Sequence, residues 1–224
     1  MRKTVSGLYA ITPGLADSTL LIGKVDAALR GGACVVQYRN KAADEQLRHE
    51  QALAIARLCR GAGACFIVND SIKLARDVGA DGVHLGKDDD GVDAARALLG
   101  PAKLIGVSCY NQLWRARDAV AQGADYVAFG SFFPSPTKPR TVTASRDLLR
   151  AAKKFPLPIV AIGGITPENA AGLIEAGADA VAVVSAVFDA PDVERAARRM
   201  AGLFAAHNES LNCNHENEKR DSFR

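Results

Sequence analysis

The sequence predicts a single-domain α/β protein in which eight parallel strands close into a (β/α)8 barrel. Short apolar or β-branched runs alternate with longer alanine- and leucine-rich runs of helical spacing, and eight such pairs fit within 224 residues. The strand runs are continuously apolar, as in a sheet covered on both faces. An open doubly wound sheet is the alternative, but the first strand is followed by Thr12-Pro13-Gly14 rather than by a glycine-rich phosphate turn.

Each strand is expected where an apolar run occurs, at residues 8–11, 34–38, 65–68, 82–85, 104–107, 126–129, 159–162 and 180–184. The helices are expected between them, near residues 18–31, 44–61, 71–78, 91–99, 111–122, 143–154, 167–176 and 191–206. A short motif recurs between a helix and the next strand, at Gly79-Ala80-Asp81, Gly123-Ala124-Asp125 and Gly177-Ala178-Asp179. Its glycine suits the left-handed residue just past a helix, so we interpret the motif as structural.

Composition indicates a globular protein with a basic balance too small to suggest a nucleic-acid partner. Hydrophobic residues make up 48% and charged residues 24%, and the formal net charge is +3. No apolar segment is long enough to span a bilayer, and no signal-like segment follows the basic N-terminus, so we expect a cytoplasmic protein without a membrane partner. The five cysteines form no C-x-x-C pair, which argues against a disulfide framework or a structural zinc site.

The chain is expected to divide at residue 207. Residues 1–207 would form the barrel domain. Residues 208–224 are rich in Asn, Glu, Lys, Arg and Asp, and they are expected to form a disordered tail because they add little apolar surface to a core. The sequence leaves homo-oligomer formation open.

Polar residues and glycines follow nearly every expected strand. Because the active site of a (β/α)8 barrel lies at the C-terminal ends of its strands, these residues should meet at one rim. They are Gln37, Tyr38, Arg39, Asn40 and Lys41, then Asn69 and Asp70, residues 86–90, Ser108, residues 130–138, Gly163 and Gly164, and Ser185.

Cations and carboxylates at one rim suggest Mg²⁺ with a phosphorylated substrate. Arg39, Lys41 and Lys138 would supply the cations, and Asp70 with one of the aspartates at 88–90 would supply the carboxylates. The alternative is that these charges only form ion pairs across surface loops. For any single residue the two explanations are about equally reasonable, but surface pairing is a much poorer explanation for the whole set.

Two glycines after the seventh strand indicate an anion site. Gly163 and Gly164, with Val184 and Ser185 after the eighth strand, would direct backbone N–H groups at a phosphate, and phosphate sites recur at this place in such barrels. A tight glycine turn is the alternative. His84 lies inside the fourth strand, and we interpret it as a packed barrel residue rather than as an acid or base.

Six motifs occur in the order seen in the thiamine phosphate synthase family, which the chain resembles over about residues 7–206. They lie at residues 37–41, 66–70, 81–86, 105–108, 134–138 and 162–165. The resemblance implies a transferase of a pyrimidinylmethyl group: a pyrimidine carrying a methyl diphosphate loses pyrophosphate, and the nitrogen of a thiazole phosphate takes its place.

The resemblance also implies roles for individual residues. The pyrimidine diphosphate would be held from the 37–41 motif (Gln37, Tyr38, Arg39, Asn40, Lys41) and by Asn69, Ser108 and Lys138, and the thiazole phosphate by Ser135, Thr137, Gly164, Val184 and Ser185. Asp70 and Asp89 would bind Mg²⁺. The candidate catalytic residues are Arg39, Lys41, Lys138 and Ser108, because the departing pyrophosphate needs charge stabilisation more than acid–base groups.

Four positions depart from the family pattern, and two other functions stay open. The family often has Glu at Asn40 and Gln at Lys87, and each of these two differences makes the rim here one unit more positive. Ser131 and Ser135 stand where Pro and Thr are common, and Ser135 keeps a hydroxyl group. A thiazole tautomerase shares the barrel and the thiazole phosphate pocket but tends to lose the diphosphate and metal residues kept here. A non-catalytic phosphate-binding barrel would leave Asp70 and Asp89 unexplained.

Overall fold

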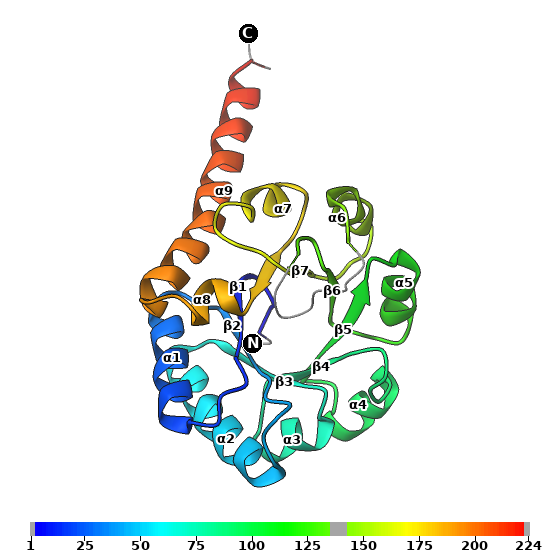
Figure 1. The fold of residues 1–224 in the computed structure, drawn as a ribbon. Helices are drawn as coiled ribbons and strands as arrows, with labels where there is room; N and C mark the ends of the chain where they lie inside the picture. Colours follow the sequence, from blue (N-terminus) through cyan, green and yellow to red (C-terminus); the bar gives the residue numbers. More distant parts are fainter. Residues whose placement is uncertain (1–2, 135–142, 222–224) are drawn as a thin grey trace.

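The computed structural model is a closed barrel of eight parallel strands. It describes residues 3–134 and 143–221, with residues 208–221 through their backbone only. The strands follow one another around the barrel in sequence order, and β1 pairs with β8 to close it (Figure 1). The predicted fold is confirmed, because a strand lies at each predicted position: β1 (Gly7–Ile11), β2 (Val35–Tyr38), β3 (Cys65–Asn69), β4 (Gly82–Leu85), β5 (Leu104–Tyr110), β6 (Tyr126–Gly130), β7 (Ile159–Ile162) and β8 (Ala180–Val183).

Helices surround the barrel and cover the outer face of the sheet (Figure 1). Apart from the region after β7 and β8, they lie close to the positions predicted from the periodicity. They are α1 (Ser18–Arg30), α2 (Glu45–Ala62), α3 (Ile72–Asp77), α4 (Val92–Leu99), α5 (Leu113–Ala121), α6 (Arg146–Ala152), α7 (Ala171–Glu175), α8 (Ser185–Phe188) and α9 (Val193–Asp221).

Two helices after β7 and β8 differ from the prediction. A helix was expected near 167–176, but residues 167–169 form a turn and α7 begins only at Ala171. The Thr166 N–H donates to Asn169 Oδ1 at 2.9 Å, which closes that turn before the helix starts. The short helix α8 follows β8 directly and was not predicted, because four residues are too few to show helical periodicity.

Two apolar layers stabilise the fold, one inside the barrel and one between the sheet and the helices. Successive side chains of a strand point to opposite faces, so each strand contributes to both layers. Val35, Cys65 and Leu104, near the starts of their strands, fill the barrel interior. Leu8 and Phe66 pack outward against the helices. Each large apolar side chain buried in this way stabilises the fold by about 1.5–3 kcal/mol relative to exposure.

The recurring Gly-Ala-Asp motif fixes the N-terminal end of the barrel, as the structural interpretation predicted. Its glycines have positive φ angles of 67°, 82° and 108° at residues 79, 123 and 177. Each of its three aspartates, Asp81, Asp125 and Asp179, accepts a backbone N–H of a neighbouring strand at 2.7–2.8 Å, from Phe66, Ile105 and Ile159 respectively. Each aspartate also forms an ion pair at 2.7–3.1 Å, with Lys3, Arg96 and Lys153 respectively.

The last helix, α9, packs on the barrel at its start and then extends away from it (Figure 1). Arg30 Nε in α1 donates to Glu194 Oε2 at 2.9 Å, which ties the start of α9 to the first helix. The backbone of residues 208–221 continues this helix, whereas the sequence indicated a helix ending near 206 and a disordered tail. The division into a domain at 1–207 and a tail at 208–224 stays a prediction.

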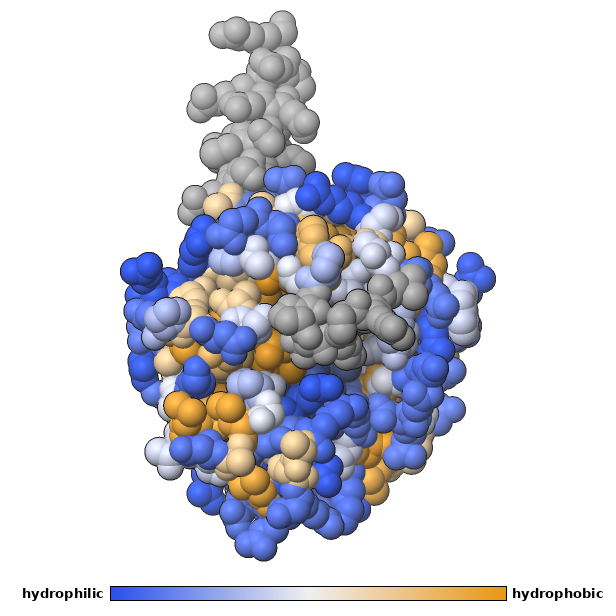
Figure 2. Space-filling view, viewed as in Figure 1, coloured by the Kyte–Doolittle hydropathy of each residue, from blue (hydrophilic) through white to orange (hydrophobic). Residues whose placement is uncertain are grey.

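The outer surface of the helices is mostly hydrophilic, with smaller hydrophobic areas between them (Figure 2). Among the residues that the structure describes, no helix is both long enough and apolar enough to cross a membrane. Four of the five cysteines have described side chains, and these four, Cys34, Cys59, Cys65 and Cys109, are free thiols.

Candidate active site

A cavity of about 210 Å³ opens at the C-terminal end of the barrel. All eight strands or the loops after them contribute to its lining, which explains why the polar residues at the strand ends meet at one place. A larger cleft of about 550 Å³ lies outside, along α2 and α3, but it is lined by surface residues such as Glu45, His49 and Lys73. We take the barrel cavity as the candidate site because ligands of this fold bind where the strands end.

Seven of the predicted site residues line this cavity. They come from β2, β3, β5 and the loops after β2, β7 and β8, and they are Gln37, Arg39, Asn69, Ser108, Gly164, Val184 and Ser185. Arg39 is held at the end of β2 by Thr12, whose hydroxyl accepts the Arg39 N–H at 2.8 Å and donates to the Arg39 carbonyl oxygen at 3.2 Å. The backbone of Arg39 is therefore fixed by the neighbouring strand before any ligand binds.

The three charged residues Lys41, Asp70 and Asp89 meet beside the cavity. Lys41 Nζ lies 3.0 Å from Asp70 Oδ2. Asp89 Oδ2 accepts the Gly86 N–H at 2.6 Å. Partial burial raises the pKa of Asp89, and the neighbouring carboxylate of Asp70 raises it further, against the opposing hydrogen bond from Gly86 and the charge of Lys41. Two adjacent carboxylates of this kind attract a divalent cation.

The backbone of Asp70 is turned into the left-handed region, with a φ angle of 64°. Its N–H donates to the His84 carbonyl oxygen at 2.9 Å, and the next N–H, from Ser71, donates to the Asn69 carbonyl oxygen at 2.7 Å. Aspartate is one of the few residues other than glycine that adopts this conformation readily. The turn directs the chain sideways at the end of β3 and places Asp70 next to Lys41.

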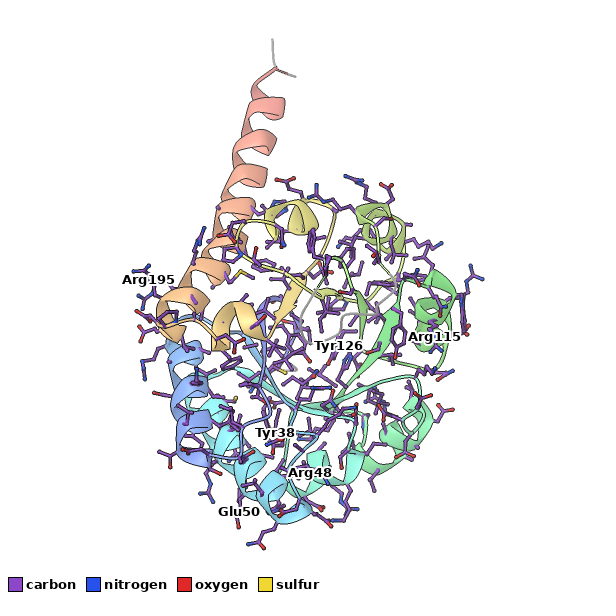
Figure 3. All side chains as sticks on the ribbon, in the orientation of Figure 1. Tyr38, Arg48, Glu50, Arg115, Tyr126 and Arg195 are labelled. Atoms are coloured by element: carbon purple, nitrogen blue, oxygen red, sulfur yellow. The ribbon has the colours of Figure 1, made fainter. Side chains whose placement is uncertain are left out.

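Tyr38 and Asn40 lie outside the cavity, contrary to their predicted role in substrate binding. The Tyr38 hydroxyl donates to Gln51 Oε1 on α2 at 2.9 Å. Asn40 Nδ2 donates to the same oxygen at 3.1 Å and to the Leu15 carbonyl oxygen at 2.9 Å. The reason is strand alternation, since Gln37 and Arg39 face inward and Tyr38 must face the helices. Figure 3 shows Tyr38 toward α2 and Tyr126 at the centre of the barrel.

Two glycines after β7 let the loops that follow β6 and β7 approach closely. Gly163 and Gly164 have φ angles of 104° and 61°. A Cβ atom on Gly163 would lie 2.0 Å from Ser131 Oγ, and one on Gly164 would lie 2.4 Å from the Pro134 carbonyl oxygen. Any side chain at either position would therefore push the β6 loop away from the cavity. The predicted contacts Ser135, Thr137 and Lys138 lie just beyond, outside the described residues.

Val184 and Ser185, at the start of α8, line the same side of the cavity. The first hydrogen bond of this helical turn runs from the Val187 N–H to the Val184 carbonyl oxygen at 3.2 Å. The N–H groups of Ser185 and Ala186 precede it, and such groups have no partner within their own helix. Gly164, Val184 and Ser185 line this side of the cavity, and their binding of a phosphate stays a prediction.

Sequence reasoning missed three aromatic residues that line or underlie the cavity. His84 does lie in the barrel interior, as interpreted, but it also lines the cavity, where its Nε2 is 2.9 Å from Ser108 Oγ. Tyr9 also lines the cavity, and Tyr126 lies within hydrogen-bond distance of both Tyr9 and His84. Burial raises the pKa of both tyrosine hydroxyl groups, which therefore stay protonated. The signal was available: Tyr9, Gln37, His84 and Ser108 all fall on inward-facing positions of their strands.

Comparisons with known proteins identify the family of this chain. A family model described as thiamine monophosphate synthase matches residues 8–187. Thiamine-phosphate synthase of Thiobacillus denitrificans is 56% identical over 93% of this chain and 100% of that protein. The one from Nitrosospira multiformis is 52% identical over 91% of this chain and 87% of that protein. The chain belongs to the thiamine monophosphate synthase family.

Solved structures place the same family on the same barrel. Thiamine phosphate pyrophosphorylase from Pyrococcus furiosus aligns with a TM-score of 0.78 and 36% identity, over 88% of this chain and 94% of that one. Orotidine 5′-phosphate decarboxylase from Pyrococcus horikoshii aligns with a TM-score of 0.62 at 13% identity, which shows a shared fold only. The resemblance noted from six short motifs is thus confirmed for the thiamine monophosphate synthase family over most of the chain.

Proposed function

We propose that this chain is a thiamine phosphate synthase. It would join 4-amino-2-methyl-5-(diphosphooxymethyl)pyrimidine to a thiazole phosphate and release thiamine monophosphate and pyrophosphate. The observation that carries the proposal is the meeting of Lys41, Asp70 and Asp89 beside a cavity lined by Arg39 and Ser108. A site for a leaving diphosphate needs this combination of cations and carboxylates next to a less charged pocket for the ring.

The reaction makes modest demands on acid–base groups. The bond between the pyrimidine methylene and the diphosphate oxygen breaks, and its electron pair leaves with the pyrophosphate. The lone pair of the thiazole nitrogen then forms the new bond to the methylene carbon, so no proton has to move. The amino group of the pyrimidine donates electrons to the methylene carbon as positive charge develops there. The chain therefore has to stabilise the leaving group and align the two rings.

Arg39 and Lys41 are proposed to hold the departing diphosphate. The guanidinium of Arg39 can donate two parallel hydrogen bonds to phosphate oxygens, whereas the ammonium of Lys41 acts as a mobile point charge. Lys41 is exposed and pairs with Asp70 in the free protein, so it can turn from that carboxylate to the diphosphate. Lys138 is proposed as a third cation on the basis of the family resemblance.

Mg²⁺ fits the donor set at the rim, and we propose Asp70 and Asp89 as its protein ligands. The carboxylates of Asp70 and Asp89 lie next to each other, and among the described residues no group of three or more potential metal-ligating side chains occurs. One or two carboxylates are the usual protein contribution to Mg²⁺, whose other ligands are phosphate oxygens and water. When bound, the ion would neutralise negative charge on the diphosphate. The positive charge of the ion would also reduce the repulsion between the carboxylates of Asp70 and Asp89.

The thiazole phosphate is proposed to bind on the other side of the cavity. The N–H groups of Gly164, Ser185 and Ala186 would hold its phosphate, with Ser135 and Thr137 adding hydroxyl groups. The two phosphate groups would then lie at opposite parts of the rim, and the two rings would meet over the cavity between them.

Pyrophosphate release from the purified protein tests the proposal. Release should require both substrates and Mg²⁺, and Asp89→Ala should abolish it. Protein that is folded but releases no pyrophosphate would contradict the proposal. Isomerisation of a thiazole phosphate without pyrophosphate release would favour a tautomerase, and binding of thiazole phosphate without turnover would favour a phosphate-binding barrel.

The cytoplasm is the compartment that we propose, since the buried thiols of Cys59, Cys65 and Cys109 are unpaired and suit a reducing environment. The partners proposed are the two small-molecule substrates, without a nucleic-acid or membrane partner. A homo-oligomer stays a prediction that sedimentation of the purified protein would test.

A further inference from the structure

A chain of hydrogen-bonded polar side chains crosses the barrel at the floor of the cavity. Gln37 Nε2 lies 2.7 Å from the Tyr9 hydroxyl, which lies 3.0 Å from the Tyr126 hydroxyl. The Tyr126 hydroxyl lies 3.1 Å from His84 Nδ1, and His84 Nε2 lies 2.9 Å from Ser108 Oγ. Five strands thus contribute one side chain each, and the chain ends at two residues that line the cavity from different sides, Gln37 and Ser108.

The hydrogen bonds of this chain can run in one direction only, once the amide at its start is fixed. An amide nitrogen always donates, so Tyr9 accepts from Gln37 and must use its own proton on Tyr126. Tyr126 in turn donates to His84 Nδ1. The proton of the imidazole therefore sits on Nε2, where it is donated to Ser108 Oγ. Ser108 is left with its own proton to donate into the cavity.

Packing holds the middle of the chain in place. The ring of Tyr126 lies over Gly106 on the adjacent strand β5, where a Cβ atom would come within 2.0 Å of the ring. The His84 ring stacks on Tyr126 with centroids 5.5 Å apart. Tyr9 and Tyr126 are fully buried, so neither hydroxyl can exchange its partner for bulk water. Tyr126 is the one member of the chain that does not line the cavity, so reversing the order of donors and acceptors would require a buried hydroxyl that a ligand does not reach to turn as well.

We propose that Tyr9, Tyr126 and His84 are positioning residues that fix the polarity of the pyrimidine site. They hold Gln37 with its carbonyl oxygen as an acceptor and Ser108 as a donor. The site then favours a ring with an amino group toward Gln37 and an unprotonated ring nitrogen toward Ser108. This inference rests on the proposed function and adds the feature by which that site distinguishes a 4-aminopyrimidine from a 4-oxopyrimidine.

The 4-oxo analogue presents the opposite pattern. Its carbonyl oxygen would face the carbonyl oxygen of Gln37, and neither group could donate. In the native protein the amide of Gln37 cannot turn over to correct this, because its nitrogen would lose Tyr9 as acceptor and the whole chain would have to reverse. A site whose buried polar groups are committed in this way rejects the mismatched ligand strongly.

Two tyrosine variants test the proposal by binding rather than by overall rate. In the wild type, the inhibition constant of the 4-oxo pyrimidine methyl diphosphate, measured against the 4-amino substrate, should exceed the KM of that substrate by about 30-fold or more. In Tyr9→Phe and Tyr126→Phe this ratio should fall to about 3-fold or less, because the amide becomes free to rotate. The KM of thiazole phosphate should change less than about 2-fold.

A matched control separates positioning from loss of stability. Arg96→Met removes a partly buried set of hydrogen bonds at the opposite end of the barrel, where it lowers stability without touching the cavity. Its ratio for the two pyrimidines should equal that of the wild type. An unchanged ratio in both tyrosine variants, or an equal fall in Arg96→Met, overturns the proposal.

The tautomer of His84 provides a readout that needs no activity. Nitrogen NMR of the ligand-free protein, with the His84 signals assigned from their loss in His84→Gln, should show a proton on Nε2 and none on Nδ1. In Tyr126→Phe this preference should weaken. A proton on Nδ1 in the wild type would mean a reversed chain and would overturn the proposal. Failure of the wild type to turn over the 4-amino substrate would instead reject the proposed function, with the tautomer result still valid for the chain.

Discussion

The two ends of the barrel use charged residues in opposite ways. At the N-terminal end, Asp81, Asp125 and Asp179 each accept a backbone N–H and pair with a cation, so every one of these carboxylates is neutralised by a fixed partner. At the C-terminal end, Asp70 and Asp89 lie next to each other, and this proximity helps to raise the pKa of Asp89. The aspartate–cation pairs at the N-terminal end stabilise the fold. The adjacent carboxylates at the C-terminal end leave negative charge available to bind a ligand.

Burial differs between Arg96 at the N-terminal end and Lys41 at the C-terminal end. The Arg96–Asp125 pair has side-chain exposures of 28% and 13%, whereas Lys41 at the rim is 64% exposed. A cation that must reach a substrate needs freedom to move, and one that closes a loop needs to be held. Mutations at the two ends should therefore separate stability from activity.

The largest effect is expected for Asp89→Asn at the C-terminal end. The neutral amide should lower pyrophosphate release by about 100-fold or more, because one of the two proposed ligands of Mg²⁺ loses its charge. The melting temperature should stay the same or rise slightly. Since the pKa of Asp89 is raised in the folded protein, its ionised form destabilises that state above this pKa, and Asn removes the cost. A pyrophosphate release assay and a thermal melt check both parts, and a large fall in melting temperature would contradict the contrast between the ends.

Ligand-induced stabilisation sharpens the same contrast. Mg²⁺ with inorganic pyrophosphate at about 100 times the dissociation constant should stabilise the wild type by about 2.7 kcal/mol, or roughly 5–10 °C in melting temperature. Pyrophosphate with a chelator should give a smaller shift. The shift with Mg²⁺ should nearly vanish in Asp89→Asn and persist in Arg96→Met. An equal shift in all three proteins would place the binding site elsewhere.

Arg96→Met should give the largest loss of stability at the N-terminal end. Its guanidinium donates to the Gly100, Lys103 and Gly123 carbonyl oxygens and to Asp125 Oδ2 at 2.6–3.1 Å. Removing it should cost about 2 kcal/mol, or about 4–8 °C in melting temperature. The kcat/KM of the folded enzyme at 25 °C should change less than about 2-fold. Loss of activity without loss of stability would show that this end also affects the reaction.

The smallest effect is expected for Lys3→Met. Its ammonium pairs with Asp81 at 2.9 Å, but both side chains are about one-third exposed. Pairs of this kind contribute about 0–1 kcal/mol, so the melting temperature should fall by no more than about 4 °C. If Lys3→Met cost as much as Arg96→Met in a thermal melt, burial would not be the factor that ranks the pairs.

The barrel could be predicted from the sequence because the alternation of strand and helix patterns is repeated eight times. Eight apolar runs alternate with helical runs, and every run predicted as a strand forms one. The Gly-Ala-Asp motif occurs in three loops that each join a helix to the next strand, and this repetition indicated that its role is structural. The helix α8 and the late start of α7 were missed because each depends on a few residues without periodicity.

The sequence also predicted most of the site, because the ends of parallel strands must meet at one rim. It named Gln37, Arg39, Asn69 and Ser108, and the structure places all four in the lining of one cavity. Tyr38 was included because it lies between Gln37 and Arg39 in the sequence, but the structure places its side chain outside the cavity. In a strand the next residue points to the opposite face.

By itself, the sequence determined the number and order of the strands, the family, and the kinds of charge brought to the rim. The strands follow from periodicity and the charges from the residues after each strand, which are properties of local segments. The family follows from the resemblance of six short motifs. Only the tertiary structure decided that Tyr9, Tyr126 and His84 join Gln37 to Ser108, since these residues come from five strands and meet only when the barrel closes. The direction of a hydrogen bond depends on the partner across the barrel, and no local pattern encodes it.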